Sequence, residues 1–504
     1  MNCSRIRVRN AWLVRGDGGE PRREELLVSA EEGILAAGGP FIDGGEVIDG
    51  RGCFLAPGFI DAHGHSDISA LAFPDCFSMV SQGVTTEIAG NCGLAAFPLT
   101  GKNREHLEAL YAEYGVSLDW DDYPSYRETL RKRGCALDVI ALCGHNTLRA
   151  AVAGYEKKVL SRSEVEEMKR LLALALSAGS PGLSTGLLYV PGKFAPDEEI
   201  VELMKVLARH EAVYTTHLAS EGDGLLEALD RTFAMARSAG LKKVQISHFK
   251  TAGAANWGKL DEALERIRQA EAAGIRVTVD RYPYTESMTQ LSVILPGAWG
   301  DMDDISLMKR LASPEDRIGL AAALRQARSA DYWKTVRLVS TGAAAGRGGL
   351  GRRLSELSED PASFVVELLA EDAAGTCAAF SGMSPENLDR IMALDFCMPG
   401  SDGNALSRDC RVKTHPRAFG TVPRFLRRLL EKNVPPGEVV RRACGLPAET
   451  FGLADRGLLV PGRRADLVLF DPGELEDTAD FSSPASPARG IGLTMVSGKI
   501  VYRP

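Results

Sequence analysis

Histidine and closely paired cysteines are scarce in this chain of 504 residues. It holds eight histidines, and none of its ten cysteines lies in a Cys-x-x-Cys pair. Scattered, unpaired cysteines are typical of reduced thiols in a cytoplasmic protein, where most of them fill the core. We therefore expect a cytoplasmic location and no disulfide framework.

Other features are also missing. No apolar run reaches the length of about 18 residues that a membrane helix needs, so no membrane partner is predicted. The N-terminal segment lacks the charged-then-apolar pattern of a secretory signal. The formal net charge is −8, without the basic stripe that nucleic acid requires. The sequence leaves open whether the chain forms a homo-oligomer.

The composition, with 45% hydrophobic and 25% charged residues, is typical of a globular enzyme, and the length predicts more than one module. Short apolar runs separated by glycine and charged turns predict β-strands in residues 1–56 and again in residues 455–504. Because chain ends often lie close together, we expect these two parts to form one small discontinuous β-domain.

The middle of the chain alternates between strand-like and helical patterns. Eight apolar runs end in polar residues, and amphipathic helical patterns separate several of them. This alternation predicts a (β/α)8 barrel, with residues 57–284 as its first part and 346–454 as its last. Residues 285–345 are longer than a connection needs and predict an inserted lid segment. The eight runs are 59–65, 84–92, 138–146, 182–191, 212–220, 243–250, 276–284 and 395–403.

One helix start carries a capping pattern. Ser163 precedes Glu166 by three residues, ahead of a periodic apolar stretch, and Gly179 follows it. This spacing predicts a capping box at Ser163 and a helix that stops at the glycine.

Two histidines close the first strand run. His63 and His65 are two residues apart, so on a strand they point to the same face and can reach one ion. A lone His-x-His is a weak signal, but other runs end in the same kind of residue. In a barrel the strand ends meet at one rim, and imidazole, thiolate and carboxylate together suit Zn²⁺. The further candidates are Cys92, His217, His248 and Asp402.

Taken in order, these motifs resemble the N-acyl-D-amino-acid deacylases (D-aminoacylases) of the amidohydrolase superfamily, over nearly the whole chain. "GNCG" and "SHFK" are specific to this branch. The hydantoinases and dihydroorotases usually carry a carboxylated lysine between two metals, and no lysine ends the third or fourth run here. The other matching stretches are "PGFIDAHGHSD", "GLSTGLLYVPG", "TTHLASEG", "GSDG", "HPRAFGTVPRFL" and "RGLLVPGRRADLVLFDP".

The resemblance implies a metal-dependent barrel with a β-sandwich from both chain ends. It implies that Cys92, His217 and His248 hold a tightly bound zinc ion. His63, His65 and Asp402 would form a weaker second metal site. Zinc lowers the pKa of bound water to about 7, which makes hydroxide available to attack an amide carbonyl. Asp402 would be the general base and then the general acid.

The implied substrate is a small-molecule N-acylated D-amino acid with a free α-carboxylate. Lys250 lies two residues after His248 on a strand, so it points the same way and is a candidate carboxylate anchor. Further candidates for substrate binding are Tyr282, Tyr189, Arg417 and His145, although the last three could instead be structural.

The segment "DRYPYTESMT" departs from the family pattern and leaves the preferred side chain open. Arg281 could select an acidic substrate, whereas Glu286 could select a basic one, and Met288 could reshape the pocket.

Three alternative functions are also compatible with parts of the sequence. Ser184 lies in a Gly-x-Ser-x-Gly motif, but prolines follow where a serine hydrolase needs a helix. A dipeptidase or cyclic-amide hydrolase could use the same metal site. A non-catalytic scaffold would be expected to lose metal ligands, and none of the six positions is lost here.

Overall fold

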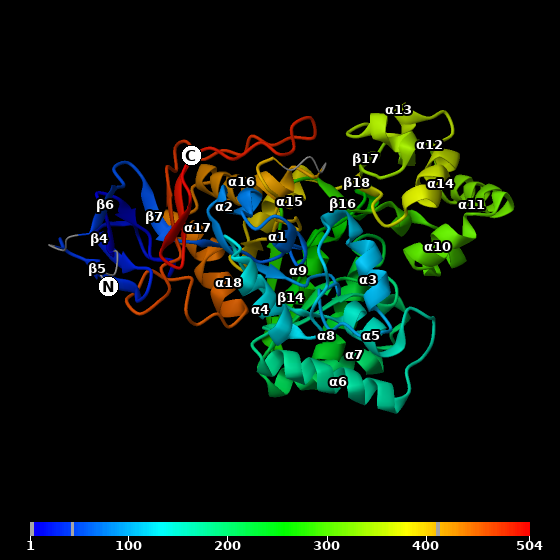
Figure 1. The fold of residues 1–504 in the computed structure, drawn as a ribbon, viewed down its shortest axis with the longest axis horizontal. Helices are drawn as coiled ribbons and strands as arrows, with labels where there is room; N and C mark the ends of the chain where they lie inside the picture. Colours follow the sequence, from blue (N-terminus) through cyan, green and yellow to red (C-terminus); the bar gives the residue numbers. More distant parts are fainter. Residues whose placement is uncertain (1–4, 42–44, 410–413) are drawn as a thin grey trace.

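The structure is a computed structural model that describes residues 5–41, 45–409 and 414–504. Figure 1 shows a central α/β body with small sheets at one end and a mixed segment of helices and strands at the other. In the described ranges, no helix is both long and apolar enough to cross a membrane. Eight cysteines in these ranges are free thiols, while Cys3 and Cys410 lie outside the described residues.

Each of the eight apolar runs contains a strand of parallel sheet. The strand order is β10-β9-β8 in one sheet and β11-β12-β13-β14-β15-β19 in another. Only Leu142 separates β10 from β11, and the Ala62 amide of the β8 end donates to the Pro399 carbonyl of β19 at 3.0 Å. This is a TIM-barrel-type arrangement. The strands are β8 (Phe59–Asp61), β9 (Val84–Ala89), β10 (Asp138–Ala141), β11 (Cys143–Gly144), β12 (Gly182–Gly186), β13 (Val213–His217), β14 (Lys243–Ile246), β15 (Arg276–Arg281) and β19 (Cys397–Pro399).

Helices cover the outside of these strands, which leaves almost every strand residue buried. Ile60, Ile88 and Met398 belong to a cluster of buried apolar side chains that the strands share. The helices are α1 (Ser69–Ala72), α2 (Phe77–Val80), α3 (Arg104–Leu110), α4 (Tyr123–Arg133), α5 (His145–Ala153), α6 (Arg162–Ser177), α7 (Asp197–Arg209), α8 (Leu225–Ala239), α9 (Leu260–Ala272), α15 (Pro385–Met392), α16 (Arg417–Glu431), α17 (Pro436–Ala443) and α18 (Gly445–Thr450).

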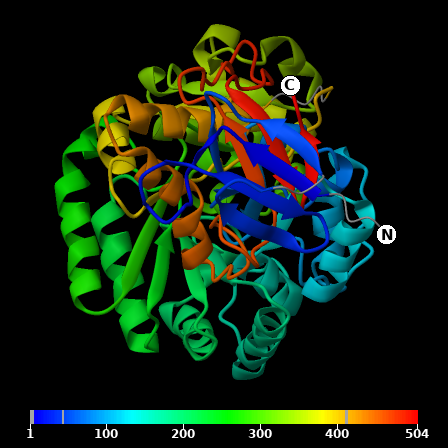
Figure 2. The ribbon, with the colours of Figure 1, turned by 90° about the vertical axis from the view of Figure 1, so that its left-hand side faces the viewer.

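Strands from both chain ends lie side by side, as the blue and red ribbons of Figure 2 show. β20 pairs with β7, and two sheets share a core that includes Val8, Leu55 and Leu467. The first sheet contains β1 (Arg5–Arg9), β4 (Glu25–Ser29), β5 (Gly33–Gly38) and β6 (Glu46–Asp49). The second contains β2 (Trp12–Leu13), β3 (Arg22–Arg23), β7 (Phe54–Pro57), β20 (Leu467–Phe470), β21 (Ile491–Val496) and β22 (Lys499–Tyr502).

A separate three-stranded sheet and five helices, hereafter the insertion, follow β15. Its central strand β18 pairs with both β16 and β17, and it has a hydrophobic core of its own. The packed unit therefore runs to Ser381, further than the predicted end at residue 345, because β18 returns to β16 from later in the chain. Its elements are β16 (Glu286–Gln290), α10 (Asp304–Arg310), α11 (Pro314–Ala327), α12 (Ala330–Trp333), β17 (Val336–Ser340), α13 (Leu354–Leu357), α14 (Pro361–Asp372) and β18 (Cys377–Ser381).

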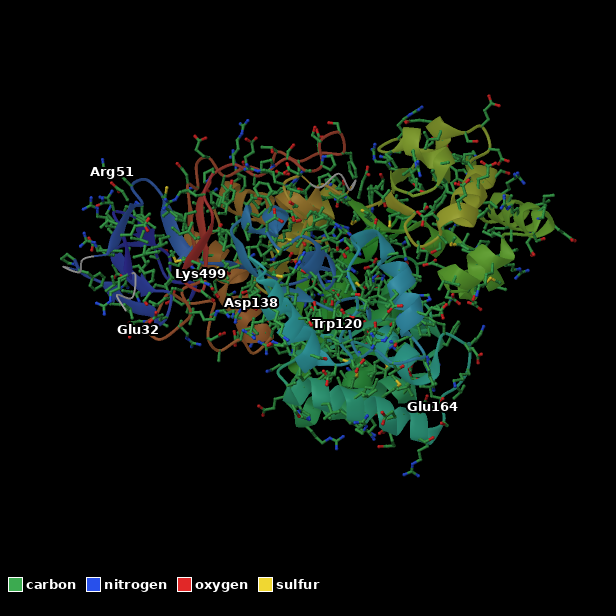
Figure 3. The ribbon with its side chains drawn as sticks, in the orientation of Figure 1. Glu32, Arg51, Trp120, Asp138, Glu164 and Lys499 are labelled. Carbon is green, nitrogen blue, oxygen red and sulfur yellow. The ribbon has the colours of Figure 1, made fainter. Side chains whose placement is uncertain are left out.

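The capping box of α6 lies two residues earlier than predicted. The Ser161 hydroxyl accepts a hydrogen bond from the Glu164 amide at 3.3 Å, and the Glu164 carboxylate accepts one from the Ser161 amide at 2.9 Å. Figure 3 labels Glu164 near one end of the helix. Gly179, with a φ of 97°, follows the helix end as predicted.

We expect Ser161→Ala to weaken the first turn of α6 by about 1 kcal/mol, because the Glu164 amide loses the Ser161 hydroxyl as its acceptor. Hydrogen exchange of residues 158–168, followed by mass spectrometry, should quicken by about fivefold. Ser163→Ala is the matched control and should have little effect. Equal effects of the two substitutions would contradict the assignment.

Candidate active site

The six side chains predicted from strand ends gather at the C-terminal rim of the parallel strands. Cys92 Sγ lies 3.4 Å from His63 Nε2 and 3.5 Å from His248 Nε2. Two ligands of a tetrahedral zinc ion, one sulfur and one nitrogen, are separated by about 3.5 Å when the metal bonds are about 2.3 and 2.05 Å. The donor atoms are therefore spaced as zinc requires.

Asp402 joins the same group. Its Oδ1 lies 3.1 Å from His65 Nε2 and 3.6 Å from His63 Nε2, and its Oδ2 lies 2.7 Å from Arg417 Nη1. Burial raises the pKa of this carboxyl, but Arg417 and the His65 hydrogen bond outweigh burial and hold the pKa well below its usual range. The carboxylate is therefore ionised and can accept a proton.

His217 completes the set beside His248. The two rings lie 4.6 Å apart between centroids, and both ring nitrogens of His217 are buried without a hydrogen-bond partner in the described residues. A buried imidazole with two unused nitrogens fits a metal ligand. The potential ligand atoms fall into two overlapping groups that share His248. These are His63, Cys92, His248 and Asp402, and His217, Glu221 and His248.

The backbone at three of these residues is left-handed. The φ angles are 53° at Cys92, 35° at His248 and 50° at Asp402. Such angles are uncommon outside glycine and cluster at functional sites. Gly64, between the two histidines, is also required, because a Cβ there would lie 2.2 Å from the Glu87 carboxyl carbon.

Two carboxylates that the sequence reasoning missed hold the histidines. Asp280 Oδ2 lies 3.2 Å from His63 Nδ1, and its Oδ1 accepts the His248 amide at 2.9 Å. Glu221 Oε1 lies 2.8 Å from His248 Nδ1. Carboxylates in these positions orient imidazoles so that the Nε2 atoms face an ion. The available signals were an aspartate inside the apolar β15 run and a glutamate four residues after His217.

Cys92 has the electrostatics of a metal-binding thiolate. Burial of the thiol raises its pKa, but the neighbouring His63 and His248 outweigh this effect and bring the pKa well below its usual range. A thiolate is the form that binds zinc.

Four of the five predicted substrate-binding residues line one cavity of about 400 Å³ above the metal-site residues, namely Lys250, Tyr282, Tyr189 and Arg417. We call this the catalytic cavity. Lys250 forms an ion pair with Glu221, and its Nζ lies 2.9 Å from His248 Nδ1. Burial alone would raise the pKa of the Tyr282 hydroxyl. The positive charges of Lys250, Arg281 and Arg417 outweigh burial, so the pKa lies below its usual value.

His145 is the exception, because it does not line this cavity. The structure buries it completely at the start of α5, where its Nε2 lies 2.9 Å from Glu199 Oε1. Glu199 also accepts a hydrogen bond from Arg149 at 2.9 Å. His145 therefore belongs to a buried polar cluster behind the strands.

Arg281 and Glu286 do not line the catalytic cavity. Arg281 is 1% exposed and lies behind Tyr282, with its guanidinium 4.1 Å from the ring centroid. Glu286 accepts hydrogen bonds from Arg353 at 2.7 Å and from Arg337 at 3.3 Å inside the insertion. Met288 does line the cavity.

Ser184 is fully buried on β12, where its hydroxyl donates to the Gly90 carbonyl and accepts from the Gly93 amide. A turn follows the strand instead of a helix. The serine-hydrolase alternative is therefore excluded by structure.

Comparison of this sequence with known proteins identifies the family to which the chain belongs. The model of the amidohydrolase family matches residues 46–330 and 381–502. N-acyl-D-aspartate deacylase of Alcaligenes xylosoxydans xylosoxydans is 33% identical over 98% of this chain and 91% of its own length. N-acyl-D-glutamate deacylase and D-aminoacylase of the same organism are also 33% identical, over 98% and 97% of this chain and 93% of each relative. The chain belongs to the N-acyl-D-amino-acid deacylases of the amidohydrolase family.

Solved structures agree with this membership. N-acyl-D-glutamate deacylase of Bordetella bronchiseptica, complexed with zinc and a phosphonate mimic of the tetrahedral intermediate, has a TM-score of 0.83 and 30% identity, covering 100% of this chain and 97% of that one. A D-aminoacylase structure has a TM-score of 0.82 and 32% identity, covering 99% and 96%. Another D-aminoacylase structure is described as having a binuclear metal centre. As a member of the deacylases, this chain is a metal-dependent hydrolase of amides.

We expect Glu221→Gln to weaken zinc binding about 10- to 100-fold, because the His248 Nδ1–H loses its charged partner. Zinc remaining after dialysis against graded chelator, measured by atomic absorption, reports this directly. Glu227→Gln, at an exposed position of α8, is the control and should retain zinc as the unaltered protein does. Unchanged retention in Glu221→Gln would contradict the orienting role.

Proposed function

We propose that this chain hydrolyses the amide bond of N-acyl-D-amino acids and uses zinc held by Cys92, His217 and His248. The observation that carries the proposal is that thiol, imidazole and carboxylate ligand atoms gather at the catalytic cavity. Cys92 Sγ lies 3.5 Å from His248 Nε2, and the His217 ring lies 4.6 Å from the His248 ring. A second, weaker site would use His63, His65 and Asp402. The intact set of six side chains favours an enzyme over a non-catalytic scaffold, and the relatives favour linear N-acyl-D-amino acids over dipeptides and cyclic amides.

The chemistry that zinc supplies when bound is a lower pKa for a water ligand and a polarised amide carbonyl. Asp402, which is ionised and lies 3.1 Å from His65, accepts a proton from water. The water oxygen forms a new C–O bond with the amide carbonyl carbon. Asp402 then returns the proton to the leaving amine, so the amide C–N bond breaks and a carboxylate and a free amino acid are released.

Three side chains are proposed to hold the substrate α-carboxylate. Lys250, Tyr282 and Arg417 line the catalytic cavity on the side of β14, β15 and the N-terminal end of α16. The Arg417 guanidinium lies 4.9 Å from the Tyr282 ring centroid, so these two groups are neighbours in the wall. Lys250 and Arg417 are each paired with a carboxylate of the site, Glu221 and Asp402, and a substrate carboxylate would share these cations with them. Tyr189 would contact the substrate from the opposite side, where its hydroxyl lies 3.2 Å from Thr289 Oγ1.

The same proposal includes the domain organisation. We infer a closed (β/α)8 barrel, supported by the Ala62–Pro399 hydrogen bond and the parallel bridge between Gly64 and Gly403. The two sheets of residues 1–56 and 455–504 would be a β-sandwich domain, supported by their common core. The insertion would be the lid, extended from its predicted 285–345 to Ser381. The chain could act as a monomer or as a homo-oligomer.

We expect zinc-supplied protein to release free amine from N-acetyl-D-amino acids and not from their L-forms. A screen should include D-leucine, D-methionine, D-aspartate and D-glutamate, because the three relatives with different names are equally similar. Release from L-forms alone would contradict the proposal.

We expect Asp402→Asn to lower kcat by about 10²- to 10⁴-fold, since it removes the proton acceptor. At least one zinc ion should remain bound, because Cys92, His217 and His248 are unchanged. The matched control is Asp395→Asn, at an exposed position just before β19, which should leave kcat unchanged. Near-normal turnover in Asp402→Asn would remove this residue from the mechanism.

We expect Lys250→Met to raise KM by about 10- to 100-fold, because a hydrogen bond to a charged group is worth about 1.5–3 kcal/mol. Lys242→Met, exposed just before β14, should leave KM unchanged. An unchanged KM in Lys250→Met would show that the α-carboxylate binds elsewhere.

A further inference from the structure

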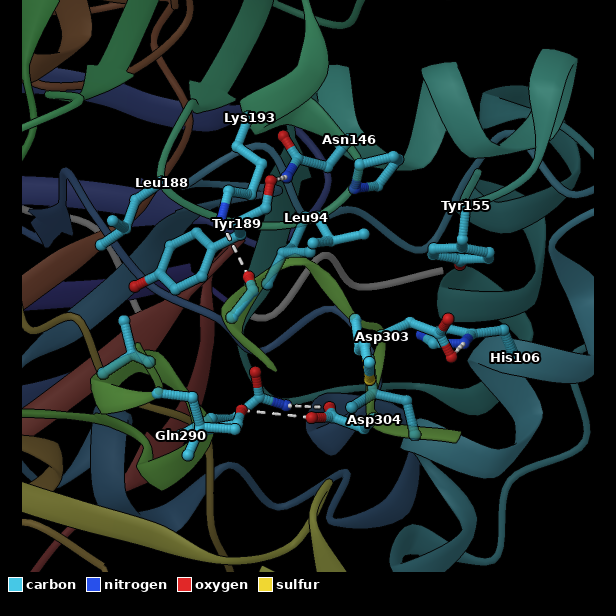
Figure 4. A pocket seen from close by; sticks show the side chains of 18 of the residues that line it. Leu94, His106, Asn146, Tyr155, Leu188, Tyr189, Lys193, Gln290, Asp303 and Asp304 are labelled. Atoms are coloured by element: carbon cyan, nitrogen blue, oxygen red, sulfur yellow. Dashed lines mark hydrogen bonds and ion pairs between the residues drawn. The ribbon is translucent and has the colours of Figure 1, made fainter. Parts of the chain in front are cut away.

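A second cavity of about 240 Å³ adjoins the catalytic cavity and has no part in the proposed mechanism. Figure 4 shows it from close by, with Tyr189 and Leu188 on one side and His106 stacked on Tyr155 on the other. The two cavities adjoin along a wall that they share. The shared residues are Leu94, Leu110, Leu188, Tyr189, Gln290 and Val293.

The second cavity lies across the metal-site residues from the proposed carboxylate anchors. Its walls come from the segments that follow β9, β11 and β12, which contribute Leu94, Asn146 and Tyr189. The anchors Lys250 and Tyr282 follow or end β14 and β15, further along the strand order. A substrate held by its α-carboxylate, with its amide carbonyl at the metal-site residues, therefore directs its acyl group toward the second cavity.

The chemistry of the second cavity changes along its length. Near the shared wall it is mainly apolar, and Val190, Leu295 and Met302 extend this surface. Two carboxylates, Asp303 and Asp304, lie at the side formed by the insertion.

The charges of this cavity exclude an anionic ligand. Lys193 is the only lysine or arginine among its described lining residues, and its Nζ already lies 2.8 Å from Asp301 Oδ1. Asp304 accepts hydrogen bonds from the neutral Gln290 and Ser292, each at 3.1 Å, so no cation neutralises it through these contacts. Asp303 Oδ1 lies 3.9 Å from His106 Nδ1, and burial lowers the pKa of this imidazole. A ligand tail that carries its own carboxylate would therefore face two acidic groups without a free lysine or arginine.

We propose that the second cavity is the acyl subsite and that it accepts uncharged, apolar acyl groups longer than acetyl, such as a six-carbon or arylacetyl group. This inference rests on the proposed function. A cavity of about 150 Å³ already holds a benzene ring in another protein. The acyl subsite, at about 240 Å³, is larger. An acetyl group would leave it unfilled, and a longer apolar chain gains from burial there.

The test compares three acyl groups on the D-amino acid that the screen turns over fastest. These are acetyl, hexanoyl and adipoyl, the last being hexanoyl with its terminal methyl replaced by a carboxylate. With zinc supplied, kcat/KM for hexanoyl should exceed that for acetyl by at least about 10-fold, because added methylenes are buried. The adipoyl compound should be no better than the acetyl one.

A substitution that fills the second cavity with a larger side chain tests whether the acyl group binds there. Met302→Trp should reduce kcat/KM for hexanoyl to the acetyl level while the value for acetyl stays within about twofold. Ile318→Trp places the same side chain in the insertion, at a position that is 72% exposed and lines neither cavity, and should change nothing. If Met302→Trp does not fold, Leu295→Phe fills the second cavity from a residue that lines that cavity and not the catalytic one.

A binding experiment distinguishes a failure of the acyl subsite from a failure of the proposed function. Calorimetry on zinc-loaded Asp402→Asn protein, with the N-acetyl, N-hexanoyl and N-adipoyl forms of D-leucine, needs no turnover. If the N-hexanoyl form alone binds more tightly to Asp402→Asn, the acyl subsite is supported. If the unaltered protein also hydrolyses none of the compounds, the proposed function is overturned. Hydrolysis with no preference for hexanoyl over acetyl, or with adipoyl equal to hexanoyl, would overturn the acyl subsite and keep the function.

Discussion

The structure of the site depends on the burial of many ionisable side chains that only their neighbours can compensate. Removing an isolated charge from water costs several kcal/mol even after relaxation. Here three of the buried groups lie against partners of complementary charge or protonation. Cys92 lies against two imidazoles, Asp402 lies between Arg417 and two histidines, and Glu221 lies between Lys250 and His248. A metal ion that accepts the lone pairs of the thiolate and the imidazoles would offset the remaining cost of burying these groups.

This mutual dependence explains why the local backbone tolerates unfavourable conformations. The left-handed φ angles at Cys92, His248 and Asp402 each cost on the order of 1–3 kcal/mol. Backbone bonds to neighbouring strand ends hold them, as when the Asp402 amide donates to the His63 carbonyl at 2.7 Å. The rigid parallel strands therefore fix side chains that a loop alone would not position.

The sequence predicted the strands and their polar ends well. A buried parallel strand is a short apolar run that can be recognised locally, and the polar residues that follow it lie at the C-terminal rim. It failed where a contact depends on distant segments. His145 also follows a strand, but it starts a helix and turns into the core, which strand position cannot reveal. Asp280 and Glu221 act on histidines through space, and the pairing of β18 with β16 joins segments that are far apart in the sequence.

The insertion lines both cavities and is therefore relevant to the choice of substrate. Glu286 cannot meet a substrate, because Arg337 and Arg353 bind it within the insertion, and this pairing fixes β16 in place. The next residues of β16, Ser287 to Gln290, then form part of the catalytic cavity wall. The insertion also carries Asp303 and Asp304, so it forms the uncharged wall of one cavity and the acidic side of the other. The strand ends supply the metal-site residues, whereas the insertion holds none of them and contributes walls to both cavities. Under the proposed function, we infer that the insertion helps to select the substituents that reach the metal-site residues.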